Sequence, residues 1–292
     1  MLIIRYYFLM EKSIKSSTNK LLTKKVYLQI AERISSVLRN CPEVLGVALV
    51  GSATIQAVKK PMNLDFLVVT KKPLSNKSLS YISSSLNIFL KCYQDCYSFR
   101  YANKSYEMEI NITPFLKKDF EEKLNNIIKG KSVELIYKDW AVGLFAPEGF
   151  CGDVKEAIVL FDQQSLLKKW RKKLHIYPKK LKKKILKNSL CDLKMKLELF
   201  HKAISRHNYL AAQMALSQLL FVIIRLLFAL NERYFQGLFW SREKLEEFPV
   251  MSKEILRLLD KLTKPENLSS KKFFEIKTQQ VGRLIKEMEK LF

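Results

Sequence analysis

Glycine is scarce in this chain, and its cysteines are neither paired nor clustered. Only 8 of the 292 residues are glycine, and after residue 165 only Gly237 and Gly282 remain. Little glycine combined with strong helical periodicity is typical of a helical bundle. The five cysteines, with no CxxC pair and no adjacent histidines, exclude a recognisable zinc site and predict reduced thiols in a cytoplasmic protein. They are Cys41, Cys92, Cys96, Cys151 and Cys191.

The sequence also lacks an apolar run long enough to cross a bilayer. The N-terminal stretch MLIIRYYFLM covers only residues 1–10, and no small-residue cleavage site follows it. The second apolar run, Leu219–Leu230, is interrupted by Arg225 and predicts a buried core helix. A buried arginine needs an anionic partner, either a carboxylate of the protein or a phosphate. We therefore expect no membrane span and no signal peptide.

Acidic residues are few relative to basic ones: 28 Asp and Glu against 52 Lys and Arg give a net charge of +24. Thirteen of the basic residues lie in Lys168–Lys196, where Asp192 is the one acid. Such clustering predicts binding to RNA or another polyanion through the phosphate backbone, with Lys180, Lys182, Lys183 and Lys184 at its centre. The alternative is a helix that faces solvent or a protein partner. Few aromatics are interspersed, so the run does not predict base-specific recognition.

The most informative stretch is LGVALVGSATIQAVKKPMNLDFLVVT, residues 45–70. Val44–Val50 and Leu64–Val69 have the length and β-branched content of buried strands. Gly51 and Ser52 follow the first strand, at a predicted helix start where backbone N–H groups can bind phosphate. Asp65 lies in the second strand, and its carboxylate should emerge at the same edge, where it can bind a divalent cation.

This arrangement resembles the nucleotidyltransferase superfamily of the polymerase-β type, which has a strand, Gly-Ser, a helix and a strand carrying two acids. The resemblance implies that Gly51, Ser52 and Asn63 bind a nucleoside triphosphate and that Asp65 binds Mg²⁺. The first metal-binding acid of the family is replaced here by Asn63. A third carboxylate, as metal ligand or general base, corresponds to Glu109, with Glu107 as the alternative. Lys59 and Lys60 either reach phosphates or belong to a solvated turn.

The remaining pattern predicts an α+β protein with two domains. We expect a mixed sheet with flanking helices in residues 1–163 and a helical bundle in residues 164–292. Helices are predicted over residues 21–40, 75–91, 114–130, 190–208, 209–230, 253–262 and 273–291. Strands are predicted over residues 97–102, 106–113 and 157–162, with Pro147, Gly149 and Gly152 in a loop.

The second half has a resemblance of its own. Tyr177-Pro178 before a helix, and Leu230-Asn231-x-x-Tyr234-Phe235 after the apolar helix, resemble a bacterial nucleotidyltransferase-like family of unknown function. Aminoglycoside adenylyltransferases have a similar two-domain plan. Asn231, Tyr234, Phe235 and Trp240 come just after the long apolar helix, and from this place in the chain we expect them to face the cleft.

Two hypotheses for function follow. In the first, the protein binds a nucleoside triphosphate with Mg²⁺ in an interdomain cleft and transfers a nucleotidyl group to a hydroxyl. In the second, the loss of charge at Asn63 leaves a catalytically impaired protein that binds nucleotide or RNA. A pure interaction protein is a third class, for which the sequence has no dedicated signal.

Overall fold

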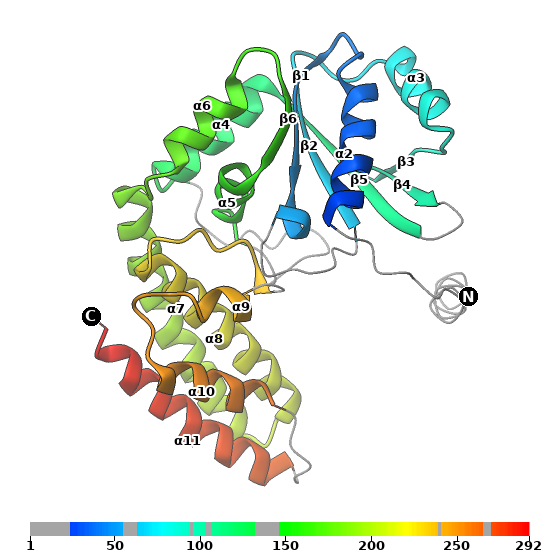
Figure 1. Ribbon diagram of the computed structural model, residues 1–292. Helices are drawn as coiled ribbons and strands as arrows, with labels where there is room; N and C mark the ends of the chain where they lie inside the picture. Colours follow the sequence, from blue (N-terminus) through cyan, green and yellow to red (C-terminus); the bar gives the residue numbers. More distant parts are fainter. Residues whose placement is uncertain are drawn as a thin grey trace. The chain divides into compact units, whose positions relative to one another are not determined.

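The computed structural model describes residues 24–54, 63–93, 96–102, 107–131, 146–238, 241–264 and 270–291 (Figure 1). These residues form two compact units. The first contains the described residues up to Phe120 together with Glu156–Arg171; the second contains Glu121–Lys155 and the residues from Lys172 onward. The predicted domain division after residue 163 stays a prediction, because compactness alone does not show which segments fold independently.

The first unit is built on a six-stranded mixed sheet with the order β3-β4-β5-β2-β1-β6. The parallel pair is β2 with β5, and the other neighbouring pairs are antiparallel. The strands are β1 (Val44–Val50), β2 (Asn63–Thr70), β3 (Lys91–Tyr93), β4 (Cys96–Ala102), β5 (Glu107–Leu116) and β6 (Ile158–Asp162). The two strands predicted on either side of Gly51-Ser52 are thereby confirmed, and they lie in the middle of the sheet.

Helices α2 (Lys24–Leu38) and α3 (Asn76–Leu86) cover one face of this sheet (Figure 1). Their buried side chains, such as Ile34 and Ile82, belong to the same apolar core as Phe66 of β2 and Ile110 of β5. All four side chains are at most 1% exposed. Because successive side chains of a strand point to opposite faces of the sheet, every second residue of these strands enters this core.

The opposite face of the sheet is contacted by α6 (Leu166–Leu174). A methyl group on Gly46 of β1 would lie 2.9 Å from Cδ1 of Leu167, so this glycine allows α6 to approach the strand closely. Phe120 of α4 (Lys117–Ile128) packs edge-on against Trp170 of α6, with ring centroids 6.4 Å apart. The sheet is therefore buried on both sides near β1.

The second unit is helical. Besides the greater part of α4, it contains α5 (Gly149–Glu156), α7 (Lys179–Ser205), α8 (Tyr209–Leu230), α9 (Ser241–Leu245), α10 (Lys253–Thr263) and α11 (Ser270–Glu289). Helix α8 is at the centre of the core, where Leu219, Ile223 and Leu227 are 0% exposed. Together with the mixed sheet, this confirms the predicted α+β class.

Among the described helices, α8 alone is long and apolar enough to cross a membrane. Its most apolar window is 67% buried inside the protein, which is the environment of a core helix. This agrees with the expectation of a buried helix at Leu219–Leu230.

Three local predictions were wrong. The helix predicted from residue 114 begins at Lys117, because Pro114 to Leu116 continue β5 beside β2. The helix predicted to residue 91 ends at Leu86, where Asn87 adopts a left-handed conformation with φ of 51°.

The predicted loop at Gly149 and Gly152 is helix α5. A methyl group on Gly152 would lie 2.6 Å from Cγ of Gln236, and one on Gly149 would lie 3.0 Å from the carbonyl oxygen of Phe235. These two glycines therefore allow the helix to pack closely on residues 235–236, and they do not form a turn.

Candidate functional site

The candidate site begins with a polar row of side chains on one face of the sheet. In β2 the apolar residues Leu64 and Phe66 enter the core, so Asn63 and Asp65 point to the other face. In β5 the buried Ile110 has the same effect on its neighbours Glu109 and Asn111. The parallel register of the two strands pairs Asn63 with Glu109 and Asp65 with Asn111. Two neighbouring strands thus place two carboxylates and two amides together.

Gly51 and Asp65 meet at the end of β1. Gly51 has a φ of +69°, and a methyl group built on it would lie only 2.7 Å from Oδ2 of Asp65. A side chain at residue 51 would therefore displace the carboxylate, in addition to being strained by the positive φ. The sequence predicted that the turn and the acid converge at one edge, and the structure brings them into contact.

The Asp65 carboxylate is held by two amides. Asn63 Nδ2 and Asn111 Nδ2 each donate a hydrogen bond to Oδ1 of Asp65, both at 2.9 Å. Among the described residues, no hydrogen bond reaches Oδ2, the oxygen that faces Gly51. The two amides therefore fix the orientation of the carboxylate and leave one oxygen directed at the turn.

The surroundings of Asp65 disfavour the ionised form of its carboxyl group. Burial raises the pKa of the Asp65 carboxyl above its ordinary value, and the nearby Glu109 raises it further, while the hydrogen bond from Asn111 lowers it. Glu109 itself is exposed. A partly buried carboxylate that has a raised pKa and a second acid beside it would be stabilised by a bound cation, and such groups are common at functional sites.

Ser52 adds an unsatisfied polar group at the same turn. It lies in the short 3₁₀ turn η1 (Gly51–Thr54), its side chain is 5% exposed, and its Oγ has no hydrogen-bond partner among the described residues. Thr54 Oγ1 donates to the carbonyl oxygen of Gly51 at 2.8 Å and closes the turn. A buried hydroxyl without a partner costs free energy unless a ligand or water pairs with it.

The structure therefore brings together Gly51, Ser52, Asn63, Asp65 and Glu109, all of which the sequence singled out. The side chain of Glu107 and residues Lys59 and Lys60 lie outside the described residues. Sequence reasoning missed Asn111 as a partner of Asp65. The signal for it was present, because Asn111 follows Glu109 by two residues and so shares its face of β5.

The described side chains alone do not supply a complete set of metal ligands. Among the described residues, no group of three or more His, Cys, Asp or Glu side chains could hold a metal ion. Asp65 and Glu109 nevertheless supply oxygen donors of the kind that Mg²⁺ prefers, and Mg²⁺ commonly completes its shell with water and substrate phosphates. The donor set fits one such ion better than two.

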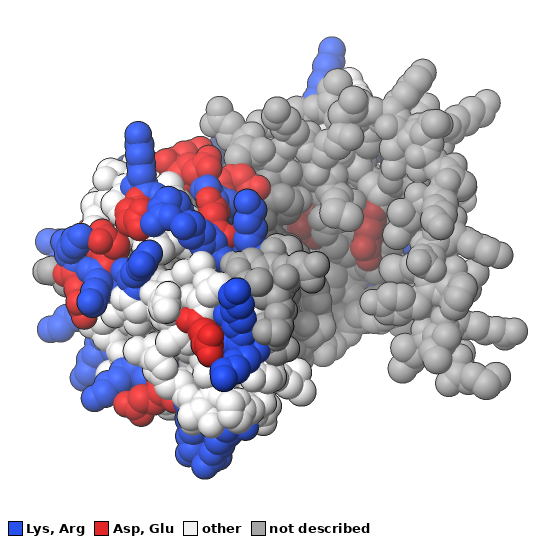
Figure 2. Space-filling view, turned by 90° about the horizontal axis from the view of Figure 1, so that it is seen from below, with Lys and Arg blue, Asp and Glu red and all other residues white. Residues whose placement is uncertain are grey.

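The basic run begins in α6 and continues through most of α7. Lys180, Lys183 and Lys184 are exposed, whereas Lys182 Nζ pairs with Oε1 of Glu232 at 2.8 Å. In the view of Figure 2, basic side chains lie among acidic ones and not in one continuous patch. Of the four lysines predicted to bind nucleic acid, three are exposed and one is part of an ion pair within the helical unit.

The arginine in the apolar helix has a protein partner. Arg225 makes a two-point contact with Glu148, from Nε to Oε1 at 2.6 Å and from Nη2 to Oε2 at 2.9 Å. The two side chains are 2% and 1% exposed. Of the two partners that the sequence left open, the structure shows the carboxylate.

The residues expected at the cleft have structural roles in the helical unit. Asn231 donates to the carbonyl oxygens of Leu227 and Val250 and accepts from the Val250 N–H at 2.8 Å, so it joins the end of α8 to a later loop. Tyr234 donates to the carbonyl oxygen of Leu174, and Phe235 is 1% exposed in the core. Trp240 lies outside the described residues.

Comparison with known proteins gives one family match. Residues 151–241 match the model of a domain of unknown function, DUF4037. A search of curated proteins gave no match. Among solved structures, the chain is similar to a nucleotidyltransferase-like protein from Exiguobacterium sibiricum, with 15% identity and a TM-score of 0.45. That similarity covers 89% of this chain and 75% of the other.

The order of elements predicted from the sequence is observed. A strand, the Gly51-Ser52 turn, a second strand with Asp65 and a parallel neighbour with Glu109 follow one another in the first unit. The family segment covers the passage from α5 to the start of α9, which includes the Glu148 partner Arg225 and the Asn231 junction.

Proposed function

We propose that this protein binds a nucleoside triphosphate together with one Mg²⁺ ion at the turn formed by Gly51, Ser52 and Asp65. The observation that carries the proposal is the contact between Gly51 and the Asp65 carboxylate, beside a buried Ser52 hydroxyl without a described partner. The Ser52 hydroxyl would donate a hydrogen bond to a phosphate oxygen of the nucleotide. The free oxygen of the carboxylate, Asp65 Oδ2, would bind the cation.

Each residue has a defined task in this proposal. Ser52 Oγ and the backbone N–H groups of the η1 turn donate to phosphate oxygens, and the absence of a side chain at Gly51 lets the phosphate approach. Asp65 and the exposed Glu109 hold the ion from neighbouring strands. When bound, Mg²⁺ neutralises charge that develops on the phosphates. Asn63 and Asn111 keep the Asp65 carboxylate in one orientation.

If the protein also transfers a nucleotidyl group, the oxygen of an acceptor hydroxyl attacks the α-phosphorus. A new phosphorus–oxygen bond forms, the bond from the α-phosphorus to the bridging oxygen breaks, and pyrophosphate leaves with the bonding electron pair. Glu109 is placed to accept the hydroxyl proton, because it is exposed beside Asp65. The acceptor is therefore expected on the side of β5.

One observation favours binding without efficient turnover. Asn63, at the place of the family's first acid, uses its amide as a hydrogen-bond donor to Asp65 Oδ1 and brings no charge. A metal clamp typically contributes several kcal/mol to the transition state, so the loss of one carboxylate is expected to slow transfer strongly. The second candidate function is therefore that of a nucleotide-binding module in the cytoplasm.

The experiment is a thermal shift titration with ATP, GTP, CTP and UTP, each with Mg²⁺, on the natural chain and on Asp65→Asn. We expect stabilisation by at least one nucleotide, dependent on Mg²⁺ and lost in Asp65→Asn. Asp119→Asn, on an exposed position of α4, is the matched control and should keep the shift. No shift with any nucleotide, or an equal shift in Asp65→Asn, would contradict the proposal.

For the basic run we propose RNA or another polyanion as partner, supported by the exposed Lys180, Lys183 and Lys184 of α7. The combined change of Lys180, Lys182, Lys183 and Lys184 to Gln should remove most binding of a mixed single-stranded RNA and flatten its dependence on salt. A control set that removes the same charge from other helices, Lys253 of α10 with Lys271, Lys272 and Lys286 of α11 to Gln, should leave binding nearly unchanged. Unchanged binding in the first variant would refute this partner.

A further inference from the structure

The face of the sheet that carries Asp65 continues beyond β5 onto β4 and β3. Residues directly opposite each other in an antiparallel pair point to the same face of the sheet. The register places Ser98 of β4 opposite Asn111 of β5, and it places Lys91 of β3 opposite Ser98. One row of side chains therefore runs from Asp65 to Lys91 across β2, β5, β4 and β3.

A second row lies beside the first on the same face. Asn63 pairs with Glu109, and Glu109 pairs in turn with Arg100 of β4. Arg100 shares the face of Ser98, because side chains two residues apart on a strand point the same way. Arg100 and Lys91 are both exposed. The acids of this face thus lie on β2 and β5, and two cationic side chains follow on β4 and β3.

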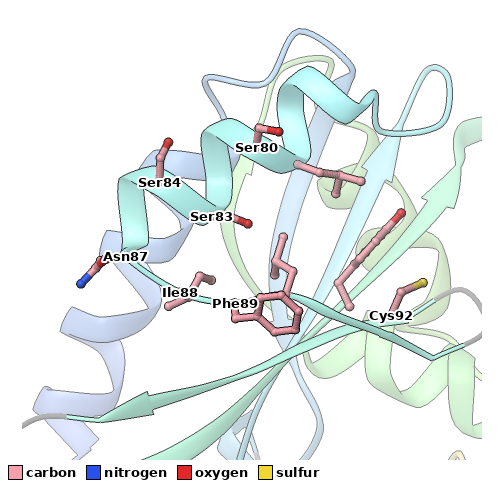
Figure 3. Close-up of a pocket in the computed structure, with 10 residues that line it drawn as sticks. Ser80, Ser83, Ser84, Asn87, Ile88, Phe89 and Cys92 are labelled. Carbon is pink, nitrogen blue, oxygen red and sulfur yellow. The ribbon is translucent and has the colours of Figure 1, made fainter.

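The opposite face of β3 and β4 is different in character. There, α3 and β3 border a groove that Cys92 of β3 and Tyr97 of β4 help to line (Figure 3). None of the residues that line the groove is Asp, Glu, Lys or Arg. Lys91 directly precedes Cys92, so the alternation of the strand sends its side chain to the other face. The charged side chains of β3 and β4 are therefore gathered on the face of Asp65.

This order of charges gives the candidate site a direction. In the proposed function, the triphosphate binds at the Gly51 turn and the acceptor hydroxyl meets Glu109 on β5. Neighbouring strands are about 4.8 Å apart, so Arg100 lies one strand beyond Glu109 and Lys91 lies roughly 10 Å beyond it. An acceptor that extends away from the triphosphate reaches first Arg100 and then Lys91.

We propose that the acceptor is a hydroxyl compound that carries a phosphate group, and that Arg100 and Lys91 bind this phosphate. The inference rests on the proposed function, because it names the acceptor class of the same site. Guanidinium and ammonium groups form charge-assisted hydrogen bonds with phosphate. The guanidinium of Arg100 has five N–H donors, so it can bind a phosphate oxygen in addition to partners within the protein.

The same two cations disfavour an acceptor of the opposite kind. A polycationic acceptor such as an aminoglycoside would be repelled by Arg100 and Lys91 when its hydroxyl is at Glu109. The acceptor class therefore differs from that of the aminoglycoside adenylyltransferases, whose two-domain plan the sequence resembles.

A phosphate beside a hydroxyl can come from a small phosphorylated sugar or from the 3′ end of RNA. Ribose 5-phosphate represents the first source, and the dinucleotide ApA represents the second. Each has a single phosphate, which keeps binding to the basic run of α6 and α7 low, because that binding depends on many phosphates. Ribose and adenosine are the uncharged counterparts, and kanamycin is the polycation.

The experiment is isothermal titration calorimetry of the full chain with each compound. It is done without nucleotide and again with Mg²⁺ and an ATP analogue that has a methylene group between the α- and β-phosphorus. We expect ribose 5-phosphate or ApA to bind, and the tighter of the two identifies the source of the phosphate. Ribose, adenosine and kanamycin should bind at least about tenfold more weakly, because they lack the charge-assisted contacts.

The variants test the two cations. Arg100→Gln combined with Lys91→Gln should weaken binding of the phosphate compound by about tenfold or more. Arg39→Gln combined with Lys77→Gln removes the same charge from exposed positions after α2 and in α3, and this control should bind as the natural chain does. Arg100→Glu combined with Lys91→Glu should bind kanamycin about tenfold more tightly than the natural chain, a gain that a misfolded chain would not show.

Three results would overturn the inference: binding of neither phosphate compound, binding that Arg100→Gln with Lys91→Gln leaves intact, or tighter binding of kanamycin than of both phosphate compounds to the natural chain. Failure of the proposed function has a separate sign. It appears as the absence of a thermal shift with every nucleoside triphosphate and Mg²⁺ in the natural chain, measured on the same preparation without an acceptor.

Discussion

Asn63 donates a hydrogen bond to the carboxylate of Asp65 from two residues earlier on the same strand. In the family that the sequence resembles, the first metal-binding acid stands at this position, whereas the amide of Asn63 carries no charge. The amide orients Asp65 without competing with it for a cation. Among the described residues of β2, Asp65 is therefore the one acid, and it is oriented by an uncharged neighbour.

Replacing this amide with an acid should restore the missing charge. In Asn63→Asp, two carboxylates on β2 and the nearby Glu109 repel one another, so we expect a lower melting temperature without Mg²⁺ and a larger rise on its addition. If transfer occurs at all, pyrophosphate release should also increase about tenfold or more, since several kcal/mol depend on the metal clamp. Asn63→Gln is the control for size, and equal responses of the two variants to Mg²⁺ would count against the account.

Gly51 is predicted to be intolerant of even one methyl group. Gly51→Ala should destabilise the fold by about 1–2 kcal/mol because φ is +69°, and should also push Asp65 out of place. Urea unfolding and the nucleotide thermal shift measure the two effects. The matched control is Gly282→Ala in α11, where a new methyl meets nothing within 4 Å, and there we expect a gain of roughly 0.5–1 kcal/mol. Similar changes at both glycines would contradict the role given to Gly51.

The buried pair of Arg225 and Glu148 should be strongly coupled. Arg225→Met leaves a carboxylate that is 1% exposed without its cation, and we expect a loss of about 3–5 kcal/mol in unfolding free energy. Adding Glu148→Leu should recover most of that loss, because no isolated charge then remains. Arg242→Met, which breaks exposed pairs with Glu246 and Asp260, should cost at most about 1 kcal/mol. A double variant as unstable as the single one would show that the pair is not the cause.

Glu43 predicts how stability changes in acid. It is 1% exposed, and the hydroxyl of Ser78 donates to its Oε2 at 2.6 Å. This hydrogen bond above all lowers the pKa of Glu43 from 4.5 to about 2. Because the pKa is lower in the folded state, the ionised group stabilises the fold above about pH 4.5, and this contribution disappears as the pH falls toward 2.

The measurement for Glu43 is urea unfolding of the natural chain and of Glu43→Gln at several pH values between roughly 6 and 3. This window covers the range in which the pKa of Glu43 in the unfolded chain differs from that in the folded chain. The variant should be less stable at pH 6, and the difference should shrink at pH 3. Glu122→Gln, at an exposed position of α4, should run parallel to the natural chain. A constant difference for Glu43→Gln at all pH values would rule out linkage as the cause.

The sequence predicted the centre of the first unit well, and physical reasons explain why. Val44–Val50 is a strand with the predicted bounds. Asp65 is the one charged residue of a mainly apolar strand, so its side chain lies on the face that points away from the core. Glu109 and Asn111 share a face of β5 because a strand alternates. Alternation and strand length are local properties, so a single sequence carries them.

Features that depend on distant partners could not be predicted in the same way. Gly149 and Gly152 predicted a loop, yet they permit contact with residues 235–236, more than eighty positions away. A helix was predicted to begin at Pro114, but pairing with β2 keeps this residue in a strand. The partner of Arg225 was left open because Glu148 is 77 residues away in sequence. Such choices are decided by tertiary packing and not by local pattern.

The most direct test of the nucleotide site uses Mn²⁺ in place of Mg²⁺, because its electron paramagnetic resonance signal reports binding itself. Free Mn²⁺ is measured as the protein is titrated in the presence and absence of ATP and of the three other nucleoside triphosphates, each compared with the same nucleotide and Mn²⁺ without protein. We expect one bound ion per chain, dependent on nucleotide and lost in Asp65→Asn but retained in Asp119→Asn. Binding of equal strength in the natural chain and in Asp65→Asn, or no binding with any nucleotide, would contradict it.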